Sequence, residues 1–179
     1  HPLVIAGGPA AFNPEPTADI FDLFLVGDGE EAFPEIVRIC GEAKPKGLDR
    51  ASLLRELARV QGVYVPSLYE VREQPLSRLV HPEPKEAWVP AVIAKRAVSD
   101  YGKSFFPSDI VVPNLRVVFD RVAVEAARGC PQNCRFCQAS SLYFPCREKD
   151  PDLLFETLIR GTENTGYESA SLSALSIGD

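Results

Sequence analysis

The chain has 179 residues, 45% of them apolar and 25% charged, which is typical of one ordinary domain or two small ones and argues against a disordered protein. Its 19 Lys and Arg residues and 25 Asp and Glu residues give a net charge of −6, which argues against a broad cationic surface for nucleic acid. No apolar run approaches the roughly 20 residues of a membrane helix, and no charged-then-apolar leader opens the chain. We therefore expect a cytoplasmic protein with no membrane partner.

Both ends of the chain are expected to be cuts through a longer protein. The sequence contains no Met and passes from His1 directly into the apolar run 3–6. At the other end, a strand expected at 171–175 is followed by only four residues, ending at Asp179.

Residues 1–45 alternate strand and helix signals. The apolar runs at 3–6 and 23–26 each end in glycine, as buried parallel strands often do, and apolar side chains recur with a helical period over 31–43. The acidic turn 27–30 favours the helix N-terminus, and a ligand role is the alternative. We predict a strand–loop–strand–helix piece of a doubly wound α/β sheet.

Residues 46–114 carry weaker patterns. After a short linker, an amphipathic helix is predicted over 50–60. Short β-like runs broken by proline follow at 63–65, 79–80, 92–94 and 110–112. We predict a helix followed by a bridging segment of short strands and extended chain.

Residues 115–179 read as one β-α-β unit. A strand is predicted over 121–127, and a second strand begins near 168. The helix between them starts at Asp150-Pro151, an N-cap acid followed by proline at the first helical position. A cysteine-rich loop follows the first strand at its carboxyl end, where α/β barrels place their active sites.

Five cysteines occur, and three of them form a Cys-x3-Cys-x2-Cys motif: Cys130, Cys134 and Cys137. An odd number of cysteines crowded in this way favours metal ligation over a disulfide framework. Soft thiolates select iron–sulfur clusters or zinc. A closed zinc site needs a fourth ligand, which Cys146 could supply. Cys40 lies on the apolar face of the predicted helix 31–43 and is expected to be a small buried hydrophobe.

The residues around the motif resemble the signature of the radical SAM superfamily. Arg128-Gly129 precede the first cysteine at the end of a strand, and Phe136 precedes the last cysteine. The resemblance to the cobalamin-binding type of radical SAM protein, a type of largely uncharacterised function, covers essentially the whole chain. It rests on these further segments: 7–9, 26–30, 119–125, 137–139 and 171–173.

The resemblance implies three parts. Residues 1–45 would be the C-terminal half of a Rossmann-like domain of the cobalamin-binding type, 46–114 a helix and bridging segment, and 115–179 the start of a radical SAM partial TIM barrel. In such proteins the three motif cysteines ligate a [4Fe-4S] cluster, which binds S-adenosylmethionine. One-electron reduction cleaves this cofactor to a 5′-deoxyadenosyl radical, which acts on a substrate. The substrate is unknown, and the electron donor would be a small protein such as flavodoxin or ferredoxin.

The resemblance also assigns cofactor contacts. Phe136 matches an aromatic residue near the adenine of S-adenosylmethionine, and the end of the second strand matches a segment that contacts its methionine amino group. The residues assigned there are Ser176, Gly178 and Asp179. Cobalamin is implied by the resemblance alone, because the Asp-x-His-x-x-Gly motif that usually binds it does not occur around His1 or His81.

Two other functions are compatible with the cysteine motif. One is an iron–sulfur electron-transfer module with Cys146 as fourth ligand, and another is a cofactor- or partner-binding module whose cluster is structural. Arg135 and Arg147 could contact anions, but solvated loop cations are commoner. If the chain is a radical SAM enzyme, we expect this fragment alone to be inactive, since residues that bind substrate would lie beyond Asp179.

Overall fold

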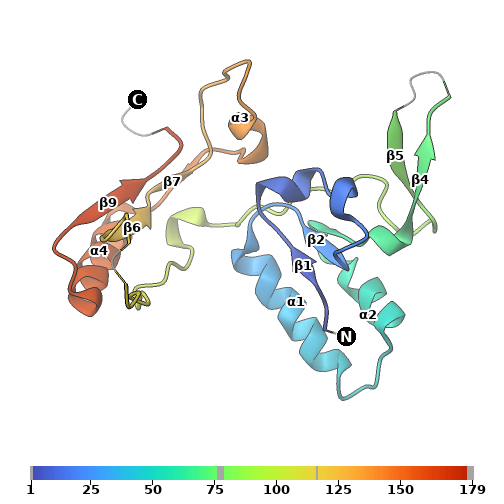
Figure 1. The fold of residues 1–179 in the computed structure, drawn as a ribbon, viewed down its shortest axis with the longest axis horizontal. Helices are drawn as coiled ribbons and strands as arrows, with labels where there is room; N and C mark the ends of the chain where they lie inside the picture. Colours follow the sequence, from blue (N-terminus) through green and yellow to red (C-terminus); the bar gives the residue numbers. More distant parts are fainter. Residues whose placement is uncertain (1, 76–78, 116, 177–179) are drawn as a thin grey trace. The chain divides into compact units, whose positions relative to one another are not determined.

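Residues 2–75, 79–115 and 117–176 are described in a computed structural model of the chain. The fold is mixed α/β with small sheets. The chain divides into two compact units, His1–Val98 and Ser99–Asp179 (Figure 1), and each unit is described by itself. The three-part division expected from the sequence stays a prediction.

The first unit contains a three-stranded sheet in the order β1-β2-β3. Strands β1 (Ile5–Ala6) and β2 (Leu23–Leu25) are parallel, as predicted. Strand β3 (Val63–Tyr64) pairs with β2 in the antiparallel direction. The sequence gives no sign of this pairing, which depends on contact between stretches about 40 residues apart.

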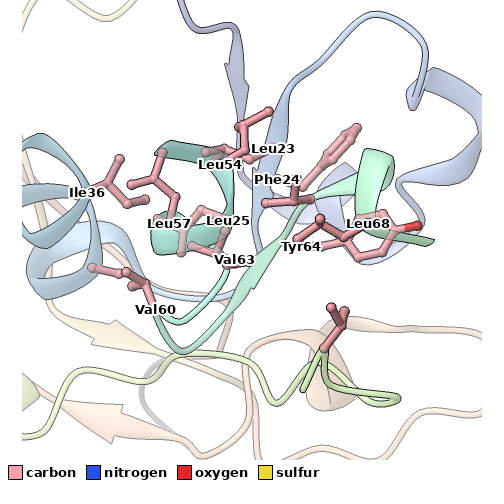
Figure 2. Close-up of a cluster of buried hydrophobic side chains, with 14 of the residues drawn as sticks. Leu23, Phe24, Leu25, Ile36, Leu54, Leu57, Val60, Val63, Tyr64 and Leu68 are labelled. Atoms are coloured by element: carbon pink, nitrogen blue, oxygen red, sulfur yellow. The ribbon is translucent and has the colours of Figure 1, made fainter. Parts of the chain in front are cut away.

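Helices α1 (Gly29–Ala43) and α2 (Arg50–Leu57) contribute side chains, together with the sheet, to the core of the first unit. Asp49 starts α2 as its N-cap, since its carboxylate accepts a hydrogen bond of 2.7 Å from the Ser52 N–H. Figure 2 shows side chains from both helices and from the sheet gathered in one cluster. Its most deeply buried members include Leu23, Phe24, Ile36, Leu57 and Val63. Burying each side chain of this size contributes about 1.5–3 kcal/mol.

Short 3-10 helices and one hairpin complete the first unit. The 3-10 helices span Pro9–Phe12, Glu15–Thr17 and Pro66–Leu68. Strands β4 (Tyr69–Glu73) and β5 (Val80–Pro84) form an antiparallel hairpin at the edge of this unit (Figure 1).

The strands predicted at 92–94 and 110–112 are absent from the described chain, so those two predictions are wrong. Instead, Arg96 and Val98 are fastened to the turn after β2. The Arg96 N–H donates to the Val26 carbonyl at 2.9 Å, and the Asp28 N–H donates to the Arg96 carbonyl at 2.9 Å. A Cβ at Gly27, where φ is +108°, would lie 2.0 Å from the Arg96 carbonyl oxygen. The two backbone segments approach so closely here that only glycine, which has no Cβ, fits at position 27.

The second unit is built around a parallel pair, β6 (Val122–Glu125) and β9 (Ala170–Ser173), connected through helix α4 (Pro151–Thr165). The β-α-β unit is thus present. The Asp150 carboxylate caps α4 by accepting from the Asp152 N–H at 2.9 Å, as its place before Pro151 predicts. The helix ends at Gly166, which has a left-handed φ of +72°.

The second unit also contains a small antiparallel pair that the sequence does not predict. Strands β7 (Ala127–Arg128) and β8 (Arg147–Glu148) join, with Arg128 opposite Arg147. The short helix α3 (Ala139–Leu142) lies between them in the chain, and a 3-10 helix spans Tyr101–Lys103. Among the helices of the described residues, none combines the length and apolar character needed to cross a membrane.

Candidate metal centre

The three motif cysteines lie on one loop, residues 129–146, which we call the cysteine loop. It leaves β7, includes α3 and returns into β8 (Figure 1). Because β7 continues from β6, the loop follows the carboxyl end of a strand in a parallel β-α-β unit. This is the end of such units at which α/β proteins commonly build their sites.

The two ends of the loop touch at Gly129. Its φ is +99°, and a Cβ added there would lie 2.6 Å from the Cys146 Cα and 2.9 Å from the Pro145 carbonyl oxygen. No side chain fits at this separation, so glycine is required where the loop begins. We call this contact, together with the Arg128–Arg147 pair, the neck of the loop. The contact at Gly129 brings Cys146 beside the residue that precedes Cys130. The spacing of the cysteines in the sequence does not reveal this arrangement.

The cysteine thiols are free, and most are accessible. Cys134, Cys137 and Cys146 are exposed and Cys130 is half-buried. The Cys137 N–H donates to the Cys134 carbonyl at 3.0 Å, which makes a tight turn between the last two cysteines of the motif. No group of three or more His, Cys, Asp or Glu side chains within ligand distance of one point occurs among the residues described. The structure therefore places the motif cysteines on one loop but does not gather their sulfur atoms.

The donor set nevertheless fits a cluster. Three free thiols of one loop, none of them fully buried, can turn toward a common centre, and thiolate sulfur is the donor that iron–sulfur clusters require. Cys40 behaves differently. It packs against the core from α1, and burial raises the pKa of its thiol, as expected for a structural cysteine.

A buried tyrosine packs against the two arginines of the neck. Tyr101 is 3% exposed, and three cationic side chains approach its ring. The distances to the ring centroid are 5.0 Å from the Arg128 Cζ, 5.3 Å from the Arg147 Cζ and 4.7 Å from the Lys149 Nζ, all within the range of cation–π attraction. Arg147 is thus a packed side chain, not the solvated loop cation that the sequence favours. Tyr101 lies 27 positions before Arg128 and 46 before Arg147, so no local motif signals its role.

The expected cofactor contacts are placed only in part. Phe136 is 92% exposed on the cysteine loop. Ser176 lies just beyond β9, while Gly178 and Asp179 lie outside the described residues. The assignment of these four residues to S-adenosylmethionine stays a prediction.

Comparison with known proteins gives two findings. Residues 1–66 match the family described as "Radical SAM proteins, N-terminal". This match supports membership of the radical SAM superfamily. The matched stretch contains none of the motif cysteines, so the radical SAM match and the cysteine motif are separate observations.

The chain is also similar to a protein of Methanocaldococcus jannaschii named "Uncharacterized protein MJ0966". The two are 28% identical over 178 residues, which cover 99% of this chain and 32% of the relative. The chain thus spans about a third of that protein's length. No solved structure matches the chain.

Proposed function

We propose that the chain is part of a radical SAM enzyme in which Cys130, Cys134 and Cys137 hold a [4Fe-4S] cluster. The observation that carries the proposal is the placement of three free thiols on one loop at the carboxyl end of a parallel β-α-β strand. The radical SAM match over residues 1–66 supports it independently. We further propose that 1–45 is part of a Rossmann-like domain and that 115–179 begins a partial TIM barrel, in a cytoplasmic protein.

The bound cluster would supply a site for S-adenosylmethionine and the electron that cleaves it to a radical acting on the substrate. This chain's own part is to bind and orient. The neck at Gly129 fixes where the cysteine loop starts and ends. The α4 helix, capped by Asp150, ties β6 to β9, so that Ser176 follows the strand paired with β6. Phe136, Ser176, Gly178 and Asp179 are the proposed contacts of S-adenosylmethionine.

Other parts of the proposal rest on the resemblance alone. The electron donor would be a small protein such as flavodoxin or ferredoxin, and the substrate is unidentified. Cobalamin stays a prediction, and the cysteine loop does not need it to bind a cluster.

A second function is favoured by one observation. The neck brings Cys146, an exposed thiol, beside the start of the cysteine loop. If Cys146 became a fourth ligand, the cluster would have no open iron for S-adenosylmethionine and would serve electron transfer. The ligand count therefore separates the two functions.

The test is anaerobic reconstitution of the chain with iron and sulfide. We expect one [4Fe-4S] cluster per chain, detected by Mössbauer spectroscopy and by iron and sulfide analysis. Single Cys130→Ala, Cys134→Ala and Cys137→Ala variants should each lose most of it, because each removes one of three ligands. Cys40→Ala is the matched control and should keep the cluster.

The Cys146→Ala variant then decides between the functions. A radical SAM site predicts that this variant keeps its cluster and that S-adenosylmethionine changes the EPR signal of the reduced cluster. Loss of the cluster in Cys146→Ala would favour the electron-transfer module. Stoichiometric zinc without sulfide in anaerobically purified protein would refute both.

A further inference from the structure

The neck of the cysteine loop contains an unfavourable arrangement. Arg128 and Arg147 are directly opposite each other in the antiparallel pair of β7 and β8. Like charges in this position repel and destabilise a strand pair. The Glu125 carboxylate offsets part of the repulsion, since Arg128 donates to it from Nε at 3.0 Å and from a terminal nitrogen at 2.7 Å.

Tyr101 supplies the other compensation. Both guanidinium groups lie over its ring, with the Cζ atoms of Arg128 and Arg147 at 5.0 and 5.3 Å from the ring centroid. Tyr101 is almost fully buried. Low exposure strengthens such cation–π contacts, because little water competes for the cation. The ring thus lets two arginines occupy opposite positions at the base of the loop.

The 3-10 helix that carries Tyr101 is itself anchored to the segment after β8. The Asp150 N–H donates to the Gly102 carbonyl at 3.1 Å. The Lys149 ammonium donates to the Ser104 carbonyl at 2.6 Å and approaches the Tyr101 ring at 4.7 Å. Lys149 is only 8% exposed, so this anchor is part of the packed interior of the unit. The backbone around Tyr101 is therefore held in place by hydrogen bonds from the segment after β8, and the neck packs against the Tyr101 ring.

The backbone of each arginine adjoins one end of the cysteine loop. Arg128 is two residues before Cys130, so their Cα atoms are at most about 7.6 Å apart, given 3.8 Å between consecutive Cα atoms. Arg147 follows Cys146, whose Cα lies against Gly129. Thiolate ligands bring negative charge to this loop, and cations beside a cluster favour its reduced form.

We propose that Tyr101 is a positioning residue for the cysteine loop: it holds Arg128 and Arg147 at the neck and thereby keeps their positive charges at the two ends of the loop that carries the motif. This inference rests on the proposed function for its effect on a cluster. Its effect on the neck does not require a cluster.

The first experiment is limited trypsin digestion of the metal-free full chain, with cleavage sites identified by mass spectrometry. Arg135 is exposed on the loop, so cleavage after it serves as an internal reference. Tyr101→Leu removes the aromatic face but keeps an apolar side chain. We expect this variant to show several-fold more cleavage after Arg128, relative to cleavage after Arg135, because the neck opens more often. Tyr101→Phe keeps the ring and should match the unmodified protein.

The second experiment measures the reduction potential of the reconstituted cluster by EPR-monitored titration. Arg147→Gln should shift the potential in the negative direction, and Arg147→Lys should restore it. Arg121→Gln is the matched control, since it removes an exposed cation at the amino end of β6, away from the neck, and should not shift the potential.

Two results would overturn the proposal: equal cleavage after Arg128 in Tyr101→Leu and Tyr101→Phe, or equal potentials in Arg147→Gln and Arg121→Gln. If the unmodified chain forms no cluster, the proposed function fails, but the digestion pattern still decides whether Tyr101 positions the neck.

Discussion

At the scale of single residues, Asp22 connects three separate stretches of the first unit. Its carboxylate accepts from the Val4 N–H at 2.7 Å and from Arg50 at 3.1 and 2.6 Å. Arg50 also donates to the Pro2 carbonyl at 3.2 Å. Partial burial raises the pKa of Asp22, but the hydrogen bonds from Val4 and Arg50 outweigh this effect and lower the pKa below its ordinary value.

The Asp22→Asn variant should therefore be less stable, by about 2 kcal/mol for lost hydrogen bonds to a charged group. Since the folded-state pKa is lowered, the advantage of the unmodified protein is fully present above about pH 5, where a carboxyl of ordinary pKa about 3.9 is ionised. It should shrink as the pH falls through the lowered pKa. Urea denaturation of both proteins across this range measures the difference. Asp19→Asn, which changes an exposed neighbouring carboxylate, is the control. A difference that stays constant down to about pH 2 would contradict this origin of the effect.

Individual site residues were predictable from sequence only where their partners are close in the chain. Cys130, Cys134 and Cys137 lie within eight positions, so their spacing alone indicates a common metal. Tyr101 gives no such signal, because its partners Arg128 and Arg147 lie 27 and 46 positions away. Residues whose role depends on a long-range contact need the fold before they can be identified.

At the scale of elements, Asp28 in the turn between β2 and α1 makes a structural contact outside the helix that it precedes. Asp28 precedes α1 as its N-cap, yet its side chain makes no capping hydrogen bond to the helix. It accepts instead from the Val98 N–H at 2.9 Å and is 9% exposed. Together with Gly27, it fixes the segment that ends the first unit.

Replacing Asp28 by Ala should leave the Val98 N–H without this acceptor and cost about 1–3 kcal/mol. Asp28→Asn is the matched variant, since its amide oxygen can still accept, and it should lose less. Urea denaturation of the full chain gives both values, and hydrogen exchange at the Val98 amide reports the local effect. If Ala and Asn variants lost equal stability and Val98 kept its protection in both, the contact would have no role in fastening this segment.

Element prediction succeeded where local chemistry is decisive. The parallel strands β1 and β2 were indicated by short apolar runs ending in glycine, and α4 by Asp150-Pro151. The runs at 92–94 and 110–112 have strand-like residues but form no strand, because a strand also needs a neighbouring strand to receive its hydrogen bonds. Near 96 the backbone bonds to a turn instead.

At the scale of the whole molecule, the two units differ in how much apolar surface they bury. The continuous core in Figure 2 belongs to the first unit. In the second unit, the buried hydrophobic side chains described are few: Tyr101, Val122, Val124, Ala126 and Ala127. Large apolar side chains there are instead strongly exposed, among them Val111, Leu115 and Val118. A unit with a small core depends more on bound ligands for its stability.

Cluster binding should therefore stabilise mainly the second unit, which holds all three motif cysteines. A ligand at about 100 times its Kd adds about 2.7 kcal/mol to the state that binds it, which reduces opening about 100-fold. Hydrogen exchange on metal-free and reconstituted chain should show the largest gain in protection within 99–176, first around the cysteine loop and β6. Cys134→Ala, taken through the same reconstitution, is the control and should show no gain. Equal gains across both units, or a gain in the control, would mean that the protection does not come from a cluster on this loop.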